Sequence, residues 1–261
     1  MNYLCPICKN ILLRESALYR CEKGHTFDVA KEGYVNLLPV QKKKKKDPGD
    51  NAEMVLAREQ FLSKGYFDPL IEKICETLSD GENLLDIGCG TGYYDRKIKE
   101  KTAVKACGID ISRHAVRLAA KRDRAGQYAV ASAFDLPFAD ESFDVLLNVF
   151  APKAEEEYLR VLKRGGKLVE VVPGKEHLLE IKQKLYETVR LNDERSAFSR
   201  FSSAESVRVK FFKEIASGED LTELLTMTPY RYKTPQSALK SISSAVPFFV
   251  TFDFILRIHT K

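Results

Sequence analysis

Between residues 84 and 172, short apolar segments alternate with amphipathic segments of helical periodicity. This alternation is typical of a parallel sheet that is covered by helices. The sequence therefore predicts an α/β fold of the Rossmann-like type, with strands expected over residues 84–88, 104–110, 127–131, 145–150 and 167–172. A further β-rich segment, 248–258, follows a helical stretch, and we expect it to return antiparallel at or near the edge of the sheet.

Two helices are predicted ahead of the first of these strands. Asn51 can cap a helix that runs to residue 64, where Gly65 stops it, and apolar spacing favours a second helix over 68–78. We therefore divide the chain into three parts: a small N-terminal module (1–40), a basic linker with connecting helices (41–80) and the main domain (81–261).

Four metal-binding side chains lie close together near the start of the chain. Cys5 and Cys8 form a C-x2-C pair, and Cys21 and His25 form a C-x3-H pair after twelve intervening residues. Three thiolates and one imidazole complete a Zn²⁺ tetrahedron and leave no position for water. We predict a structural zinc ribbon with short strands, because a module of about forty residues rarely folds without such a metal.

The positive charge is concentrated at this zinc end. The net charge is +5, and residues 1–50 hold ten Lys and Arg against six Asp and Glu. Five lysines occupy positions 42–46, and like charges of this kind keep a linker extended in solvent. Clustered lysines beside a zinc module also bind nucleic acid by releasing counterions. Both interpretations of this run stay open.

The overall composition of the chain is that of a globular protein. No apolar run approaches the length of about 18 residues that a membrane span needs, and the first residues lack the features of a signal peptide. We expect a cytoplasmic protein with no membrane partner. Cys75, Cys89 and Cys107 lie in apolar segments and are expected to be packed free thiols.

A glycine-rich loop follows the first predicted strand of the main domain. Glycine at such a position lets the backbone approach a ligand closely. The dinucleotide pattern G-x-G-x-x-G does not fit, because Gly88 and Gly90 are followed by Tyr93, and Gly90 and Gly92 by Asp95, where a small residue is needed. The phosphate loop fails as well, since no lysine stands in register.

The pattern that remains is D-x-G-x-G-x-G at Asp86, Gly88, Gly90 and Gly92, and it resembles the first motif of the class I S-adenosylmethionine-dependent methyltransferases. Such enzymes end the next strand with an acidic residue that binds the ribose hydroxyls, which is matched by Asp110. The segments 131–138, 142–145 and 162–168 complete the order expected of this fold.

The tip of the fourth strand is where such enzymes usually hold the group that is methylated. Residues 148–153 read Asn-Val-Phe-Ala-Pro-Lys, so the Asn-Pro-Pro-Tyr motif of exocyclic-amine methyltransferases is absent and amino-group methylation is not supported. Phe150 could stack on a flipped base, although an aromatic residue at a strand end is more often part of the core. Lys153 and Lys175 could contact phosphate.

The zinc ligands, the stretch 30–40, the turn 47–50 and the stretch 227–229 together resemble the bacterial 23S ribosomal RNA (guanine-N1)-methyltransferases, over nearly the whole chain. The resemblance implies methylation of guanine N1 in a hairpin loop, zinc held by Cys5, Cys8, Cys21 and His25, and a possible homodimer. It also implies that the methyl donor contacts Gly90, Thr91, Phe67 and His177. Tyr66 is an alternative to Phe67, and Lys153 departs from the family pattern.

The resemblance leaves the chemistry at the acceptor open. Neutral guanine N1 carries a proton that must leave before or during methylation, so a base or an enolate-stabilising donor is expected nearby. Asp135 is the nearest candidate in the sequence, although a role in a turn or beside adenine is the commoner one for such a residue. Two other functions remain as alternatives: a small-molecule methyltransferase and a non-catalytic RNA-binding protein.

Overall fold

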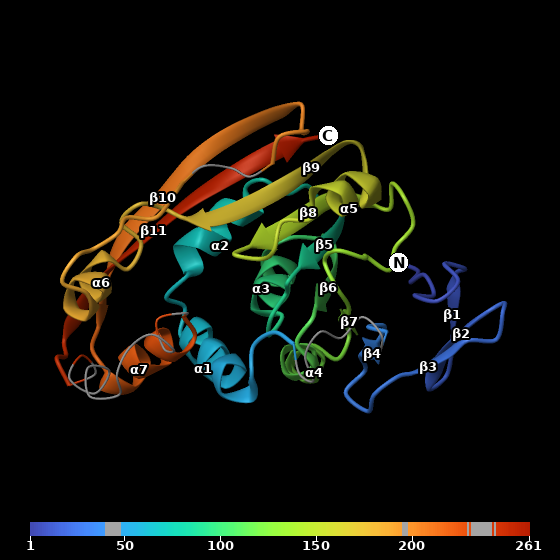
Figure 1. Ribbon diagram of the computed structural model, residues 1–261, viewed down its shortest axis with the longest axis horizontal. Helices are drawn as coiled ribbons and strands as arrows, with labels where there is room; N and C mark the ends of the chain where they lie inside the picture. Colours follow the sequence, from blue (N-terminus) through green and yellow to red (C-terminus); the bar gives the residue numbers. More distant parts are fainter. Residues whose placement is uncertain (40–47, 195–197, 229, 231–241, 243) are drawn as a thin grey trace.

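The computed structural model describes residues 1–39, 48–194, 198–228, 230, 242 and 244–261, so the five lysines at 42–46 lie outside the described residues. Two sheets are present in the part of the chain that is described. The small antiparallel sheet consists of β1 (Leu12–Glu15), β2 (Leu18–Cys21) and β3 (Thr26–Asp28). Figure 1 shows it at one end of the molecule, beside the N-terminus.

The large sheet has eight strands in the order β10-β11-β9-β8-β5-β6-β7-β4. From β9 to β4 all neighbours are parallel, and only β11 runs antiparallel to β9 and to β10. The strands are β4 (Val35–Asn36), β5 (Asn83–Ile87), β6 (Lys105–Asp110), β7 (Gln127–Val130), β8 (Phe143–Val149), β9 (Leu162–Pro173), β10 (Ser203–Ile215) and β11 (Phe248–Thr260). This topology confirms the predicted α/β fold with an antiparallel hairpin at its edge.

The helices connect the strands and cover the sheet (Figure 1). They are α1 (Ala52–Ser63), α2 (Asp68–Cys75), α3 (Tyr93–Lys101), α4 (Arg113–Arg122), α5 (Glu155–Val161), α6 (Leu179–Leu185) and α7 (Gly218–Thr226). As predicted, the Asn51 side chain caps α1 by accepting a hydrogen bond from Met54 N at 2.9 Å. Helix α2 ends three residues earlier than predicted, because residues 77 and 78 donate to carbonyls three residues back and form turns.

The zinc ribbon is joined to the main domain by more than a linker. Strand β4, which follows the ribbon, pairs with β7 and forms the edge of the large sheet. Tyr3 is fully buried, and its ring lies 5.4 Å from that of Phe138 in the main domain. The backbone N–H of Leu4 donates to the carbonyl of Pro137 at 2.8 Å. The ribbon is therefore held against the methyltransferase-like sheet by core packing.

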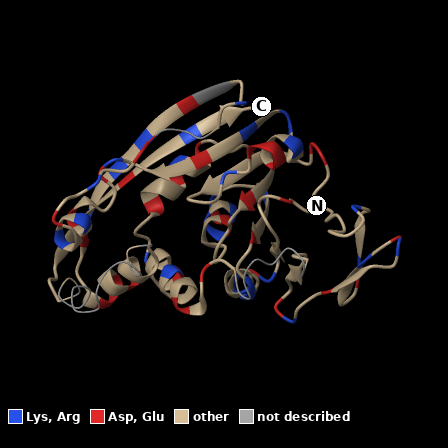
Figure 2. Cartoon of the chain, viewed as in Figure 1, with Lys and Arg blue, Asp and Glu red and all other residues tan. Residues whose placement is uncertain are grey.

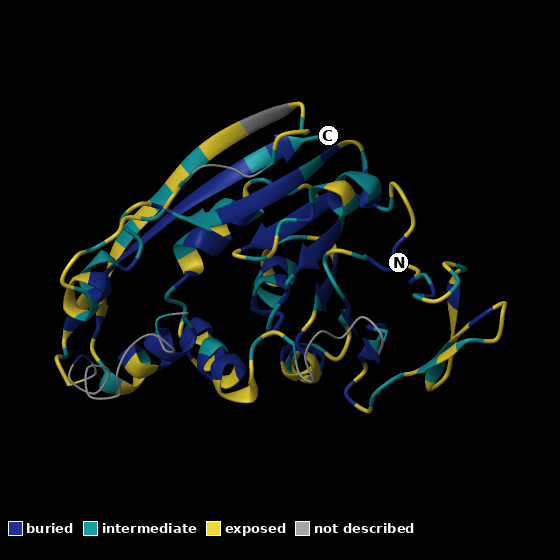
Figure 3. Cartoon of the chain, viewed as in Figure 1, coloured by how far each residue is buried: buried dark blue, intermediate teal, exposed yellow. Residues whose placement is uncertain are grey.

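The interior strands carry the core. Figure 3 shows β5, β8, β9 and β11 as largely buried, whereas many residues of the outermost strand β10 are exposed. The two faces of the sheet bury separate apolar clusters, one with α2, α3 and α7 and one with α5 and the zinc ribbon. Cys89 and Cys107 are buried and Cys75 is partly buried, as expected of packed thiols. None of the described helices is long and apolar enough to cross a membrane.

Candidate active site and metal centre

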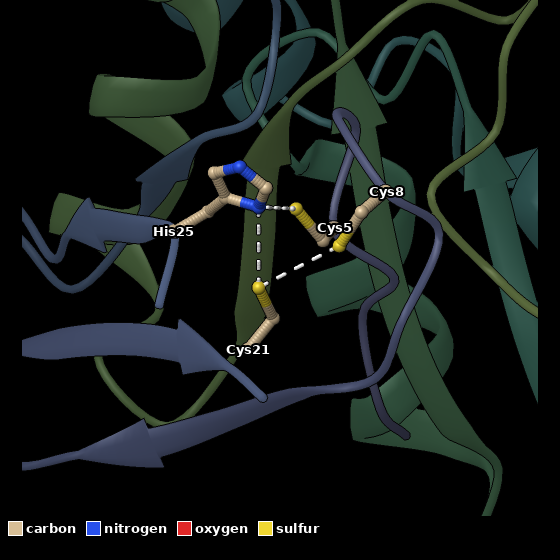
Figure 4. A group of neighbouring side chains, drawn as sticks. All are labelled: Cys5, Cys8, Cys21 and His25. Atoms are coloured by element: carbon tan, nitrogen blue, oxygen red, sulfur yellow. Dashed lines mark hydrogen bonds between the residues drawn. The ribbon is translucent and has the colours of Figure 1, made fainter. Parts of the chain in front are cut away.

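The four predicted metal ligands meet at one point of the zinc ribbon (Figure 4). The sulfur and nitrogen atoms of Cys5, Cys8, Cys21 and His25 all lie within 4.8 Å of one another. His25 Nδ1 is 3.6 Å from Cys5 Sγ and 3.4 Å from Cys21 Sγ, and the Sγ atoms of Cys8 and Cys21 are 3.6 Å apart. These separations suit the edges of a tetrahedron around Zn²⁺, and the four ligands fill it. The donor set thus fits a structural zinc ion.

The glycine-rich loop leaves β5 and turns into α3. Gly88, Gly90 and Gly92 all have positive φ, at 79°, 54° and 68°. A Cβ atom at Gly88 would lie 2.7 Å from Ala151, whereas one at Gly90 would meet nothing closer than 3.7 Å. The backbone at Gly90 therefore faces open space, which suits close approach of a ligand.

Asp110 ends β6 and holds the loop from the opposite side. Its Oδ2 accepts a hydrogen bond from Gly90 N at 3.0 Å, and its Oδ1 accepts one from Ser112 N at 2.7 Å. Burial raises the pKa of this carboxyl, although the N–H donors of Ser112 and Gly90 act in the other direction. An acceptor at the end of the second parallel strand suits the two hydroxyl groups of a ribose.

These elements border a cavity of about 750 Å³ at the carboxyl ends of the parallel strands. Ligands of open α/β sheets bind at this edge. Six of the eight predicted cofactor residues line the cavity: Phe67, Gly88, Gly90, Thr91, Asp110 and His177. Thr91 Oγ1 is buried and has no hydrogen-bond partner among the described residues. Backbone groups of the glycine loop and the Asp110 carboxylate thus give this cavity polar groups that suit a nucleoside.

Asp86 and Gly92 were also predicted to bind the cofactor, but they do not line the cavity. Asp86 is buried behind the loop, where desolvation and the charges of Asp95 and Asp110 raise its pKa well above the ordinary value. Gly92 caps α3, and its N–H donates to Cys89 O at 2.9 Å. Both residues shape the loop from the side away from the cavity.

His177 precedes α6 and lines the cavity. Its Nδ1 accepts a hydrogen bond from Asp253 N at 3.3 Å. Burial and the positive charge of Lys182 lower its pKa to about 3. The ring is therefore neutral near pH 7, and because Nδ1 is an acceptor, Nε2 carries the proton and can donate to a ligand.

Phe150 lies one residue beyond β8, in the left-handed region with φ of 56°. Its side chain is 43% exposed and lines the cavity, so it is not a core residue. The ring centroid lies 6.1 Å from that of His177 and 5.9 Å from that of Phe254. A strained backbone that holds an aromatic face at a cavity is typical of a binding site.

Asp135, the other candidate for catalysis, lies elsewhere. It sits in a turn, where its N–H donates to Ser132 O at 3.2 Å, and it does not line the cavity. Its carboxylate accepts a hydrogen bond from Lys9 of the zinc ribbon at 2.7 Å. Asp135 therefore links the main domain to the ribbon. Its place in a turn agrees with the role that is common for aspartate.

Several lining residues were not anticipated from the sequence. Asp50 and Arg58 form an ion pair of 2.6 Å at the cavity, and Arg58 also donates to Met227 O at 3.1 Å. Asn192 and Tyr230 contribute from the chain after β9. No local pattern marks these residues, because they come from segments that meet only in the folded chain.

Comparison with known proteins agrees with this architecture. Residues 3–46 match a zinc-ribbon family model described as "RlmA, N-terminal", and residues 85–169 match one described as a methyltransferase domain. YxjB of Bacillus subtilis, a candidate 23S rRNA (guanine-N(1)-)-methyltransferase, is 34% identical across 99% of this chain and 97% of its own length. The chain belongs to the 23S rRNA (guanine-N1)-methyltransferase family.

A second member of this family is the 23S rRNA (guanine(748)-N(1))-methyltransferase of Streptomyces fradiae, which is 38% identical across 69% of this chain and 67% of its own length. Among solved structures, phosphoethanolamine N-methyltransferase 2 of Haemonchus contortus, in complex with S-adenosyl-L-methionine, superposes with a TM-score of 0.51. It covers 81% of this chain and 57% of its own at 20% identity, so the likeness concerns the fold alone.

Proposed function

We propose that this protein transfers a methyl group from S-adenosylmethionine to N1 of one guanine in a hairpin loop of 23S ribosomal RNA. The observation that carries the proposal is the family membership over the full chain, together with a zinc ribbon that is packed against the methyltransferase domain. A small-molecule methyltransferase has no evident need for such a module.

The cavity supports a defined division of roles. We assign Asp110 to the ribose hydroxyls of the donor. The backbone at Gly90 and Thr91 would contact its methionine part. Phe67 and His177 also line the cavity and would contact the donor. Asp86 and Gly92 support the loop indirectly. S-adenosylmethionine supplies an electrophilic methyl group, so the main task of these side chains is positioning, which can contribute about 7 to 11 kcal/mol.

We propose that the zinc ribbon selects the RNA. N1 lies on the pairing edge of guanine, so the base must be unpaired or flipped, which suits a loop nucleotide. A second cavity, between the end of the ribbon, α1 and α4, is lined by the cations Lys31, Arg117, Lys121 and Arg124. Figure 2 marks the positions of the basic and acidic residues along these elements. Such a surface suits phosphate contacts.

The test is primer extension on ribosomal RNA from a strain that lacks the gene. Because N1-methylguanine blocks base pairing, the wild-type strain should give one reverse-transcription stop in a hairpin loop that the deletion strain loses. A plasmid copy should restore the stop, and a copy with Asp110→Ala should not. An unchanged stop in the deletion strain would contradict the proposal, and methylation of a metabolite in place of RNA would favour a small-molecule enzyme.

Two further points follow from the family resemblance. We propose a homodimer, which light scattering on the purified protein tests directly. Since ribosomal RNA is the proposed substrate, we also expect the protein to act in the cytoplasm.

A further inference from the structure

A buried carboxylate is paired with one of the residues that line the cavity. Glu170, in β9, is fully buried. Three basic side chains surround it: Lys153 Nζ at 2.5 Å, His259 Nε2 at 2.9 Å and Arg257 at 3.3 Å. Burial raises its pKa, but the hydrogen bonds from His259 and Lys153 and the charge of Arg257 outweigh this and lower the pKa to about 2.

The cluster carries a net positive charge. Lys153 and Arg257 are two cations against one carboxylate, so an excess of one positive charge remains even when His259 is neutral. Arg257 and Glu170 stand opposite each other in the antiparallel pair of β11 and β9, where Figure 2 shows basic and acidic segments adjacent. Of these side chains, Lys153 alone lines the cavity.

The loop that carries Lys153 is tightly held. The Asn148 side chain donates to Pro152 O at 3.1 Å and accepts from Ala151 N at 3.3 Å, and the Tyr158 hydroxyl donates to Pro152 O at 2.5 Å. Lys153 Nζ also lies 5.4 Å from the centre of the Phe198 ring. Its side chain is 28% exposed and lines the cavity, and its ammonium group is held by Glu170.

The described lining of the cavity offers no free carboxylate to act as a base. The acidic residues among its described lining residues are Asp50 and Asp110. Asp50 is paired with Arg58, and Asp110 accepts the backbone N–H groups of Gly90 and Ser112. A guanine that loses its N1 proton spreads the negative charge onto O6, so a fixed cation beside O6 can assist where a base is missing.

We propose that the ammonium group of Lys153 is a catalytic residue that stabilises the negative charge on O6 of the target guanine, while the ring of Phe150 supports the base from its face. The inference rests on the proposed function. The N1 proton passes to water, the N1 lone pair bonds to the methyl carbon, and the electrons of the breaking C–S bond return to sulfur. Lys153 keeps its protons throughout, and Glu170 is a positioning residue that holds it.

The first experiment compares Lys153→Gln with wild type and with Lys153→Arg in single-turnover methylation of the hairpin RNA, at saturating donor and RNA and between pH 6.5 and 9.5. Removal of one such donor typically costs about 100-fold in rate. We expect a loss of this order at pH 7, which shrinks as pH rises because the guanine then ionises without help. Lys153→Arg should retain most of the rate. The control Lys73→Gln should behave as wild type, because Lys73 pairs with Glu76 on α2 and does not line the cavity.

Two further readouts separate this role from a structural one. In the complex with S-adenosylhomocysteine, a guanine labelled with ¹⁵N at N1 should titrate at lower pH with wild type than with Lys153→Gln. A target 8-azaguanine, whose N1–H is more acidic, should restore much of the lost rate. The donor affinity of the variant should stay close to that of wild type, even though the loss of one cation beside the buried Glu170 lowers the melting temperature.

The contrary outcomes are distinct. A rate loss that does not depend on pH, or weaker RNA binding with an unchanged rate at saturation, would overturn the inference, the latter in favour of a phosphate contact. A melting temperature that falls together with donor affinity would assign Lys153 to structure alone. If the wild-type protein itself methylates no RNA, the proposed function fails, and the inference with it.

Discussion

The carboxylate of Asp110 accepts a hydrogen bond from the backbone N–H of Gly90 at 3.0 Å, across twenty residues of sequence. The bond ties the end of β6 to the loop that leaves β5. Both groups line the same cavity, so the donor loop is shaped before any ligand arrives. A preformed loop lowers the cost of ordering the site on binding.

Asp110→Asn tests this arrangement. The amide keeps the size of the side chain but removes its charge and one of its acceptor oxygens, and a hydrogen bond to a charged group contributes about 1.5 to 3 kcal/mol. We expect S-adenosylmethionine to bind about 10- to 100-fold more weakly in calorimetry. Asp144→Asn is the matched control, because Asp144 bonds to Asn83 and Lys163 and does not line the cavity. Equal losses in the two variants would contradict the assignment.

Gly92→Ala tests the packing behind the loop. A Cβ at Gly92 would lie 2.9 Å from Tyr128 Oη and 3.0 Å from Ala119 Cβ. Gly81 has a similar φ, +84° against +68°, but nothing lies within 4 Å of its added Cβ. Gly81→Ala therefore measures the cost of the left-handed backbone alone. We expect Gly92→Ala to lose about 1 to 3 kcal/mol more free energy of unfolding in denaturant titrations. Equal losses would mean that the contacts at Gly92 relax.

Cys8→Ser tests the metal centre. Loss of one thiolate opens the tetrahedron, and because zinc binding and folding are coupled in such modules, the ribbon should unfold. We expect the zinc content to fall well below that of wild type, proteolysis to begin within residues 1–38, and the donor affinity to stay within about twofold, since the ligands lie outside the cavity.

Cys75→Ser is the control for this prediction, because Cys75 is a thiol outside the zinc cluster. It should keep its zinc. If Cys8→Ser retained the fold and RNA binding but lost methyl transfer alone, the metal would have a catalytic role.

His177→Asn tests the neutral histidine. In the unfolded chain a histidine has a pKa of about 6.5, whereas in the folded protein the pKa of His177 is lowered to about 3. Between these values the unfolded state binds the extra proton, so stability is lost as the pH falls. Relative to the His177→Asn variant, wild type should lose up to about 1.4 kcal/mol per pH unit below about pH 6.5. Urea titrations at pH 7.5, 6 and 5 measure this, and a constant difference between the two proteins would contradict it.

Local patterns were sufficient for much of the fold. Strand β5 and its glycine loop, the cap of α1 at Asn51 and the return of β11 all lie where hydrophobic period and turn chemistry predicted them. The pairing of β4 with β7 was not predictable, because a two-residue strand has no period of its own. Its place depends on how the ribbon packs against the sheet.

The sequence by itself determined the class of this protein, since the zinc ligands, the glycine loop and Asp110 are specified by residue type and spacing. Only the tertiary structure decided which residues face the cavity. In the structure, Asp86 and Gly92 do not line the cavity. Asp135 bonds to Lys9 of the ribbon, and Lys153 pairs with Glu170. The reason is physical: spacing sets local conformation, but burial, charge pairing and cavity walls arise between segments that are distant in the chain.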